Sequence, residues 1–112
     1  MNPETQHYYE GRAAIIKAIA HPSRLFIVEE LSKGERCVNE LTAEIGTDMS
    51  TVSKHLSILK NAGIIGDRKS GTSIYYYLKT PCILNFLGCV EEVIECNMKQ
   101  QGEILMACRS RK

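Results

Sequence analysis

Three cysteines near the C-terminal end of the chain recur every seven residues, at Cys82, Cys89 and Cys96. Seven residues turn an α-helix through about 700°, roughly 20° short of two full turns, so the three sulfurs would lie along one edge of a helix. Thiolates bind soft ions such as As(III), Cd(II), Cu(I) and Zn(II), and three sulfurs would match trigonal As(III). Plain packing is the alternative, because cysteine is also a small apolar residue that is often buried without a chemical role.

The same spacing allows a site that two chains share. If two such helices pair antiparallel about a two-fold axis near Cys89, Cys82 of one chain approaches Cys96 of the other. Thiols paired in this way can bind a metal ion, and they can also form a disulfide or polysulfide bridge. The spacing therefore predicts a thiolate site and leaves metal binding and redox chemistry open.

Two further cysteines stand apart from this series. Cys37 would begin a helix, where the helix N-terminus favours a thiolate, although burial as an apolar side chain is the stronger expectation. Cys108 lies in the C-terminal tail beside Arg109, where it could close over a metal site or have no role. We therefore place Cys37 and Cys108 behind the other three cysteines as candidate ligands.

A second group of polar residues suits contact with DNA: Ser50, Thr51, Ser53, Lys54 and His55. The apolar side chains between residues 52 and 59 share one helical face, which would turn the polar ones toward the surface. Short hydroxyls and a lysine at the start of a helix can reach both base edges and phosphates. For His55, a local hydrogen bond or a phosphate contact is the alternative to reading a base.

Periodicity and start and stop signals predict five helices, over residues 4–20, 22–33, 37–46, 49–62 and 81–100. Between the last two, residues 64–69 and 72–78 alternate as two strands joined near Ser70 and Gly71, with Arg68 and Lys69 beside the turn. This layout is mainly α with a two-stranded β-wing, a winged helix-turn-helix. In that fold the second helix of the motif fits the DNA major groove and the wing touches the flanking backbone.

The helix expected over residues 81–100 is apolar along its length. Its stripe consists of Ile83, Phe86, Leu87, Val90, Val93, Ile94 and Met98. A helix of about 20 residues with such a stripe, at the end of a small domain, favours a dimer interface. Packing on its own domain alone is the alternative.

Size and composition limit the remaining possibilities. The chain has 112 residues and a net charge of +1, which suits one domain over residues 1–100 followed by a tail over 101–112. Residues 48–79 hold five bases and two acids, and this local excess suits a DNA-binding face. The sequence has no membrane-length apolar run and no secretory signal, so we expect a cytoplasmic protein. It has no phosphate loop, convincing Ser/His/Asp set or metal-hydrolase motif, so we do not expect an enzyme.

Three stretches carry a resemblance to a known family. Residues 18–25 (AIAHPSRL), 50–65 (STVSKHLSILKNAGII) and 68–78 (RKSGTSIYYYL) are similar to the ArsR/SmtB family of metal- and metalloid-responsive repressors. The resemblance covers roughly residues 10–98. It implies a homodimer joined through the first and last helices, repression by the apo-form and release of DNA by an inducer. A two-fold dimer would bind an inverted-repeat operator.

The chain departs from the family's known metal sites. Where the family's ELCVCDL motif has a second cysteine, this chain has Asn39 two residues after Cys37, so the thiolate pair of that motif is missing. By alignment with the family's zinc site on the last helix, Cys82 and Cys96 fall on two ligand positions, while the other two hold Thr80 and Val93. The resemblance therefore implies an effector site on the last helix that uses thiols.

Together these observations predict a DNA-binding repressor that a thiophilic metalloid or metal, with As(III) favoured, releases from its operator. One alternative is a repressor that responds to thiol oxidation or to sulfide or persulfide through a cysteine pair. The alternative from another class is a winged-helix module that binds protein without binding DNA. The basic residues Lys54, Arg68 and Lys69 favour DNA over that last alternative.

Overall fold

The computed structural model of the chain describes residues 1–101, so Cys108 and the rest of the tail lie outside the described residues. The chain divides into two compact units, the first comprising Met1–Pro81 and the second beginning at Cys82. The single domain expected over residues 1–100 stays a prediction. Among residues 1–101, no helix combines the length and the apolar content that a membrane span requires.

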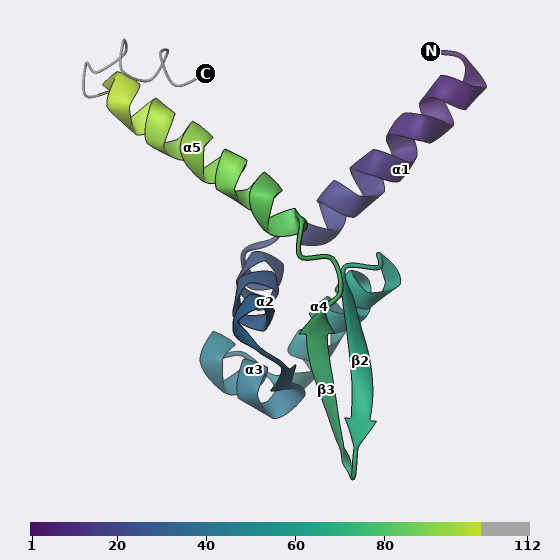
Figure 1. Ribbon diagram of the computed structural model, residues 1–112, viewed down its shortest axis with the longest axis vertical. Helices are drawn as coiled ribbons and strands as arrows, with labels where there is room; N and C mark the ends of the chain where they lie inside the picture. The colour runs from purple at the N-terminus through teal and green to yellow at the C-terminus, as the bar shows by residue number, and fades with distance from the viewer. Residues whose placement is uncertain (102–112) are drawn as a thin grey trace. The chain divides into compact units, whose positions relative to one another are not determined.

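The first unit contains four helices and a small sheet (Figure 1). In chain order its elements are α1 (Pro3–Ile19), α2 (Pro22–Lys33), β1 (Arg36–Cys37), α3 (Val38–Ile45), α4 (Met49–Asn61), β2 (Ile65–Ser70) and β3 (Ser73–Leu78). The second unit contains α5 (Ile83–Gln101). This order confirms the predicted winged helix-turn-helix, with α3 and α4 as the helical pair and β2 and β3 as the wing.

Polar side chains set where the helices begin. At α3 the backbone N–H of Cys37 donates to the Glu40 carboxylate at 2.9 Å, which forms one half of a reciprocal cap between these two residues. At α4 Asp48 is the N-cap and accepts from the backbone N–H of Thr51. Gly46 ends α3 with a φ of 82°, a left-handed conformation that glycine adopts without strain. The turn of the helix-turn-helix motif therefore consists of residues 46–48.

The sheet has three antiparallel strands in the order β1-β3-β2. Strands β2 and β3 pair in register from Ile65 opposite Leu78 to Ser70 opposite Ser73, and Gly71 turns the tip with a φ of 65°. The sequence did not predict β1, which pairs Arg36 with Tyr76 and Cys37 with Tyr75. This short strand joins the wing to the start of α3.

The apolar core lies inside the first unit. Its buried side chains are Ala18, Ile19, Ile27, Val28, Leu31, Leu41, Val52, Leu56, Leu59, Ile64 and Ile65. The inward stripe of α4, from Val52 through Leu56 to Leu59, is fully or almost fully buried, as its helical spacing predicts. Burial of this stripe fixes which face of α4 remains available to a partner.

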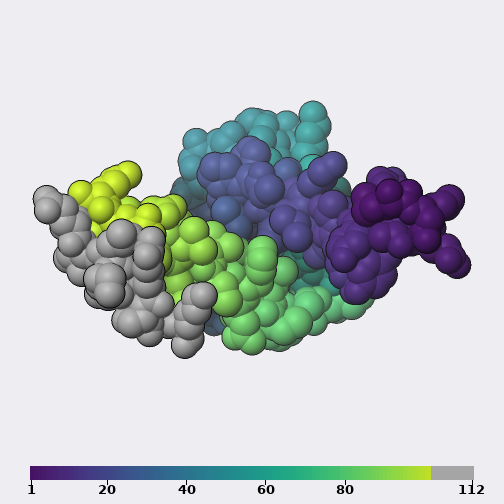
Figure 2. All heavy atoms as spheres, turned by 90° about the horizontal axis from the view of Figure 1, so that it is seen from above, coloured from purple at the N-terminus to yellow at the C-terminus, as the bar shows by residue number. Residues whose placement is uncertain are grey.

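Helices α1 and α5 expose large apolar side chains, and Figure 2 shows parts of both at the molecular surface. Helix α5 has no buried residue, and its stripe includes Phe86 and Val90, each 41% exposed. It begins at Ile83, two residues later than expected, and Cys82 lies in the turn before it. Exposed stripes of this kind indicate surfaces that a further partner covers.

Candidate nucleic-acid interface and cysteine positions

A groove of about 470 Å³ separates the start of the helix-turn-helix motif from the wing. The helical side supplies Cys37, Val38, Asn39, Met49 and Ser53, and the wing supplies Thr72, Ser73, Ile74 and Tyr76. Ser53 and Lys54 of α4 are exposed, as predicted. The first half of α4 and the tip of the wing therefore border one continuous surface.

The carboxylate of Asp48 engages two of the predicted DNA-contact residues. The hydroxyl of Thr51 donates to it at 2.7 Å, the Ser50 hydroxyl donates to its other oxygen, and the Thr51 backbone N–H adds a further bond at 3.1 Å. These donors hold the pKa of Asp48 far below its ordinary value, with Ser50 the largest cause. Since both hydroxyl hydrogens point at Asp48, the free lone pairs of Ser50 and Thr51 can only accept.

This arrangement changes what the start of α4 can recognise. A phosphate needs donors and is repelled by the Asp48 carboxylate, so the helix N-terminus does not favour a phosphate here. Amino groups of adenine and cytosine in the major groove are donors that hydroxyl oxygens can accept. The remaining lone pairs of Ser50 and Thr51 therefore match hydrogen-bond donors, such as these amino groups, better than they match phosphate oxygens.

The prediction that His55 faces outward is wrong, because its side chain is only 9% exposed. Its Nδ1 lies 3.2 Å from Nη1 of Arg24 in α2, and its ring lies 4.5 Å from that of His21. Burial lowers the pKa of His55, and the nearby His21 and Arg24 add to this effect. An arginine can only donate, so Nδ1 of His55 accepts, and His55 joins α4 to α2.

Two basic residues that the sequence assigns to the DNA-binding face are paired with acids. Arg68 of β2 binds Glu35, with Nε at 2.8 Å and Nη2 at 2.6 Å from the same carboxylate oxygen. Lys60 of α4 binds Asp67 of β2 at 2.9 Å. Lys69 takes part in none of the ion pairs between described residues. The available positive charge beside the wing is therefore smaller than the sequence count indicates.

The cysteines occupy two separate regions. Cys37 is half-buried in the groove beside the wing, whereas Cys82 and Cys89 are exposed, and all three are free thiols. Cys96 is half-buried on α5 and is disulfide-bonded. Among residues 1–101 no group of three or more potential ligands could hold a metal ion within one chain. Residues seven apart on a helix are about 10.5 Å apart along its axis, which is too far for one ion.

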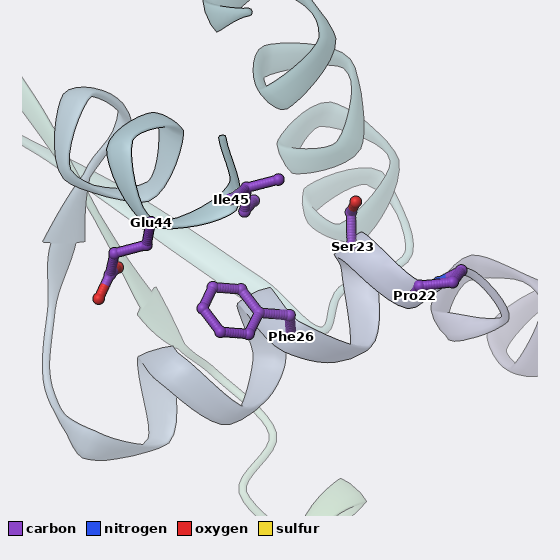
Figure 3. A pocket seen from close by; sticks show the side chains of 5 residues that line it. All are labelled: Pro22, Ser23, Phe26, Glu44 and Ile45. Atoms are coloured by element: carbon purple, nitrogen blue, oxygen red, sulfur yellow. The ribbon is translucent and has the colours of Figure 1, made fainter. Parts of the chain in front are cut away.

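A smaller pocket of about 230 Å³ lies between α2 and α3. Its lining residues are Pro22, Ser23, Phe26, Glu44 and Ile45, and Figure 3 shows how α2 and α3 contribute them. None of the predicted DNA-contact residues or cysteines lines this pocket. It therefore does not belong to the groove beside the wing.

The fold and the surface shared by α4 and the wing define the class of the protein, a winged helix-turn-helix regulator. Residues 21–66 match the family model described as bacterial regulatory protein, arsR family. The chain belongs to the ArsR family. Over 108 residues it is 32% identical to the uncharacterized HTH-type transcriptional regulator Rv0081 of Mycobacterium tuberculosis, covering 96% of this chain and 95% of the relative.

Solved structures agree with this assignment. NolR from Sinorhizobium fredii matches with a TM-score of 0.77 and 31% identity, over 83% of this chain and 93% of that one. The winged helix-turn-helix DNA-binding domain of Mb0332 from Mycobacterium bovis, described as homodimeric, matches with a TM-score of 0.74 and 26% identity, over 89% and 93%. The relatives are transcriptional regulators, which confirms the prediction that the chain is not an enzyme.

Proposed function

We propose that this chain is a homodimeric repressor that binds an inverted-repeat operator and releases it when cysteine thiolates bind a thiophilic metalloid or metal, with As(III) favoured. The observation that carries the proposal is the exposure of two free thiols, Cys82 directly before α5 and Cys89 within this unburied apolar helix. A repressor of this kind would act in the cytoplasm, where thiols stay reduced.

The DNA contacts come from α4 and the wing. The proposed residues are Ser50, Thr51, Ser53, Lys54, Arg68 and Lys69. Ser53 and Lys54 are exposed on the half of α4 that borders the groove, which suits contacts to bases and phosphates. His55 instead positions α4 through its contact with Arg24. A variant of His55 should therefore affect stability more directly than base preference.

The dimer is supported by the apolar side chains that α1 and α5 expose. Tyr8, Tyr9 and Ile16 of α1 are each about half exposed, and Val93 of α5 is 58% exposed. A solved relative, the domain of Mb0332, is described as homodimeric. A second copy that covers these stripes would also set the spacing of the two DNA-reading units on an inverted repeat.

The effector site would need sulfurs from both copies. Within one chain Cys89 and Cys96 are too far apart along the helix axis to share an ion, and Cys82 precedes the helix. Antiparallel pairing of two α5 helices would bring Cys82 of one copy toward Cys96 of the other, provided that Cys96 is reduced. An ion held there would change the angle between the two DNA-reading units only if it binds the two conformations differently.

The test is fluorescence anisotropy of the reduced protein on DNA from upstream of its own gene, titrated without oxygen with arsenite. We expect release at near-stoichiometric arsenite, and retention of DNA by Cys82→Ser and Cys96→Ser at the same concentration. Cys37→Ser, in the first unit of the chain, is the matched control and should still respond. Full release in both Cys82→Ser and Cys96→Ser would refute the proposed site.

The same experiment separates the alternatives. DNA binding that resists arsenite but disappears on oxidation or with persulfide would favour the thiol-redox repressor. Absence of DNA binding at every salt concentration, on DNA that contains the operator, would favour a protein-interaction module.

A further inference from the structure

The ion pair between Arg68 and Glu35 spans the whole width of the sheet. Arg68 is on β2 at one edge, whereas Glu35 directly precedes β1 at the other edge. The guanidinium passes over the ring of Tyr75 on the central strand, with its carbon 5.2 Å from the ring centroid. The Arg68 and Glu35 side chains remain 52% and 37% exposed. The contact is therefore an exposed one that holds the arginine toward the protein's own acid.

The pair lies on the face of the sheet that is turned away from α2 and α4. Arg68 and Tyr75 are in register on neighbouring strands, so their side chains share one face. The neighbouring register row is Asp67, Tyr76 and Arg36, and it meets the helices through the Lys60–Asp67 and Arg36–Glu30 contacts. The Arg68 side chain therefore lies on the face of the wing that does not pack against the apolar core.

A carboxylate and a phosphate compete for the same donors. A guanidinium presents a planar set of N–H groups that binds either anion, and both Arg68 bonds now end on one Glu35 oxygen. The pair raises the pKa of Arg68 and lowers the pKa of Glu35, so both groups stay charged. If a DNA phosphate takes the guanidinium, the Glu35 charge is left unpaired beside it. Glu35 therefore opposes the phosphate contact.

The pair contributes little to placing the wing. Strands β2 and β3 already pair at six register positions, β1 pairs with β3, and Lys60–Asp67 ties β2 to α4. Exposed ion pairs contribute little to stability, and here the backbone pairing of the strands already fixes the position of the wing. The main consequence of Glu35 should therefore be electrostatic.

We propose that Glu35 is an intramolecular competitor of DNA phosphate for Arg68, so that each wing exchanges a carboxylate for a phosphate when the protein binds DNA. This inference rests on the proposed DNA binding. Glu35 would thus influence the affinity of the protein for DNA without contacting a base. Because Arg68 would bind phosphate, the effect applies to operator and unrelated DNA alike.

The test compares the full chain with Glu35→Gln, Arg68→Gln and the double variant, by anisotropy on operator-containing and unrelated DNA over a range of KCl concentrations. Glu35→Gln should bind both DNAs about tenfold more tightly, the order expected for one exposed ion pair in each copy of a dimer. Arg68→Gln should bind more weakly, with a salt slope shallower by about 0.9 for each phosphate that the variant no longer neutralises. In the Arg68→Gln background, Glu35→Gln should change affinity less than about twofold.

Glu29→Gln is the matched control, since it removes the same charge from an exposed position of α2 outside the described ion pairs. An equal gain from Glu35→Gln with and without Arg68, or from Glu29→Gln, would overturn the inference in favour of general charge repulsion. Weaker DNA binding by Glu35→Gln would overturn the inference, because it would mean that Glu35 holds Arg68 in position for DNA. Wild-type protein that binds neither DNA would refute the proposed function as well, whereas wild-type binding without a Glu35 effect refutes only the competition.

Discussion

The apolar stripe of α5 gives a quantitative prediction for the variant Ile94→Ala. Ile94 is 48% exposed within one chain, and its neighbour Val93 is 58% exposed. Complete burial of an exposed side chain of this size contributes about 1.5–3 kcal/mol, so covering the exposed half of Ile94 contributes about 1 kcal/mol. Because Ile94 occurs twice in a two-fold interface, the variant should weaken the dimer by about 2 kcal/mol, which corresponds to a roughly 30-fold increase in Kd.

Sedimentation equilibrium of the reduced protein over a wide concentration range measures this Kd directly. Glu92→Ala is the control, because Glu92 lies about 200° around the helix from Ile94 and outside the stripe. We expect the control to change Kd less than about twofold. DNA binding should weaken for Ile94→Ala at protein concentrations below its new Kd, since half-sites are bound in pairs.

Two results would refute this reasoning. A Kd for Ile94→Ala that matches the control would mean that the stripe does not lie in the dimer interface. A lower Tm with an unchanged Kd would mean that the stripe of α5 packs within its own chain and stabilises the monomer, not the dimer.

Three further variants test other parts of the structure. Leu56→Ala should lower the free energy of unfolding by about 3 kcal/mol, because it leaves a cavity in the buried face of α4, and chemical denaturation measures this decrease. Gly66→Ala should lower the free energy of unfolding by about 1 kcal/mol, since its Cβ would lie 2.5 Å from Cζ and from the hydroxyl oxygen of Tyr77, and Tyr77→Ala should remove most of that decrease. The lowered pKa of His55 means that its contribution to stability is complete above the ordinary histidine pKa of about 6.5 and is lost as pH falls below it. His55→Gln should therefore flatten the decline in the free energy of unfolding that occurs as pH falls below about 6.5.

Local signals predicted most of the fold. The caps at Cys37 and Asp48 and the apolar period of α4 are each contained within a few residues, so the sequence shows them directly. The two-residue β1 was missed because a strand of that length has no readable alternation. Strand β1 forms because β3 has a free edge with which residues 36 and 37 can pair.

The candidate site was predicted less completely, because its side chains have partners far away in sequence. His55 follows Val52 by three residues and precedes Leu59 by four, a spacing that already fits the buried face, and its partner Arg24 is 31 residues away. Glu35 and Arg68 are 33 residues apart, so a count of charges along residues 48–79 overlooks the acid. The hydroxyls of Ser50 and Thr51 were placed correctly at the start of α4, but the direction of their hydrogens depends on Asp48.

The direct passage from β1 into α3 limits how this protein can respond to a signal. Cys37 is at once the last residue of β1 and the N-cap of α3, so no linker residue separates the wing from the helical pair. A rotation of the wing about its own strands would have to break either the β1–β3 pairing or the cap of α3. The wing and the helical pair α3 and α4 therefore have little freedom to move independently. A conformational change elsewhere in the protein would have to move them together.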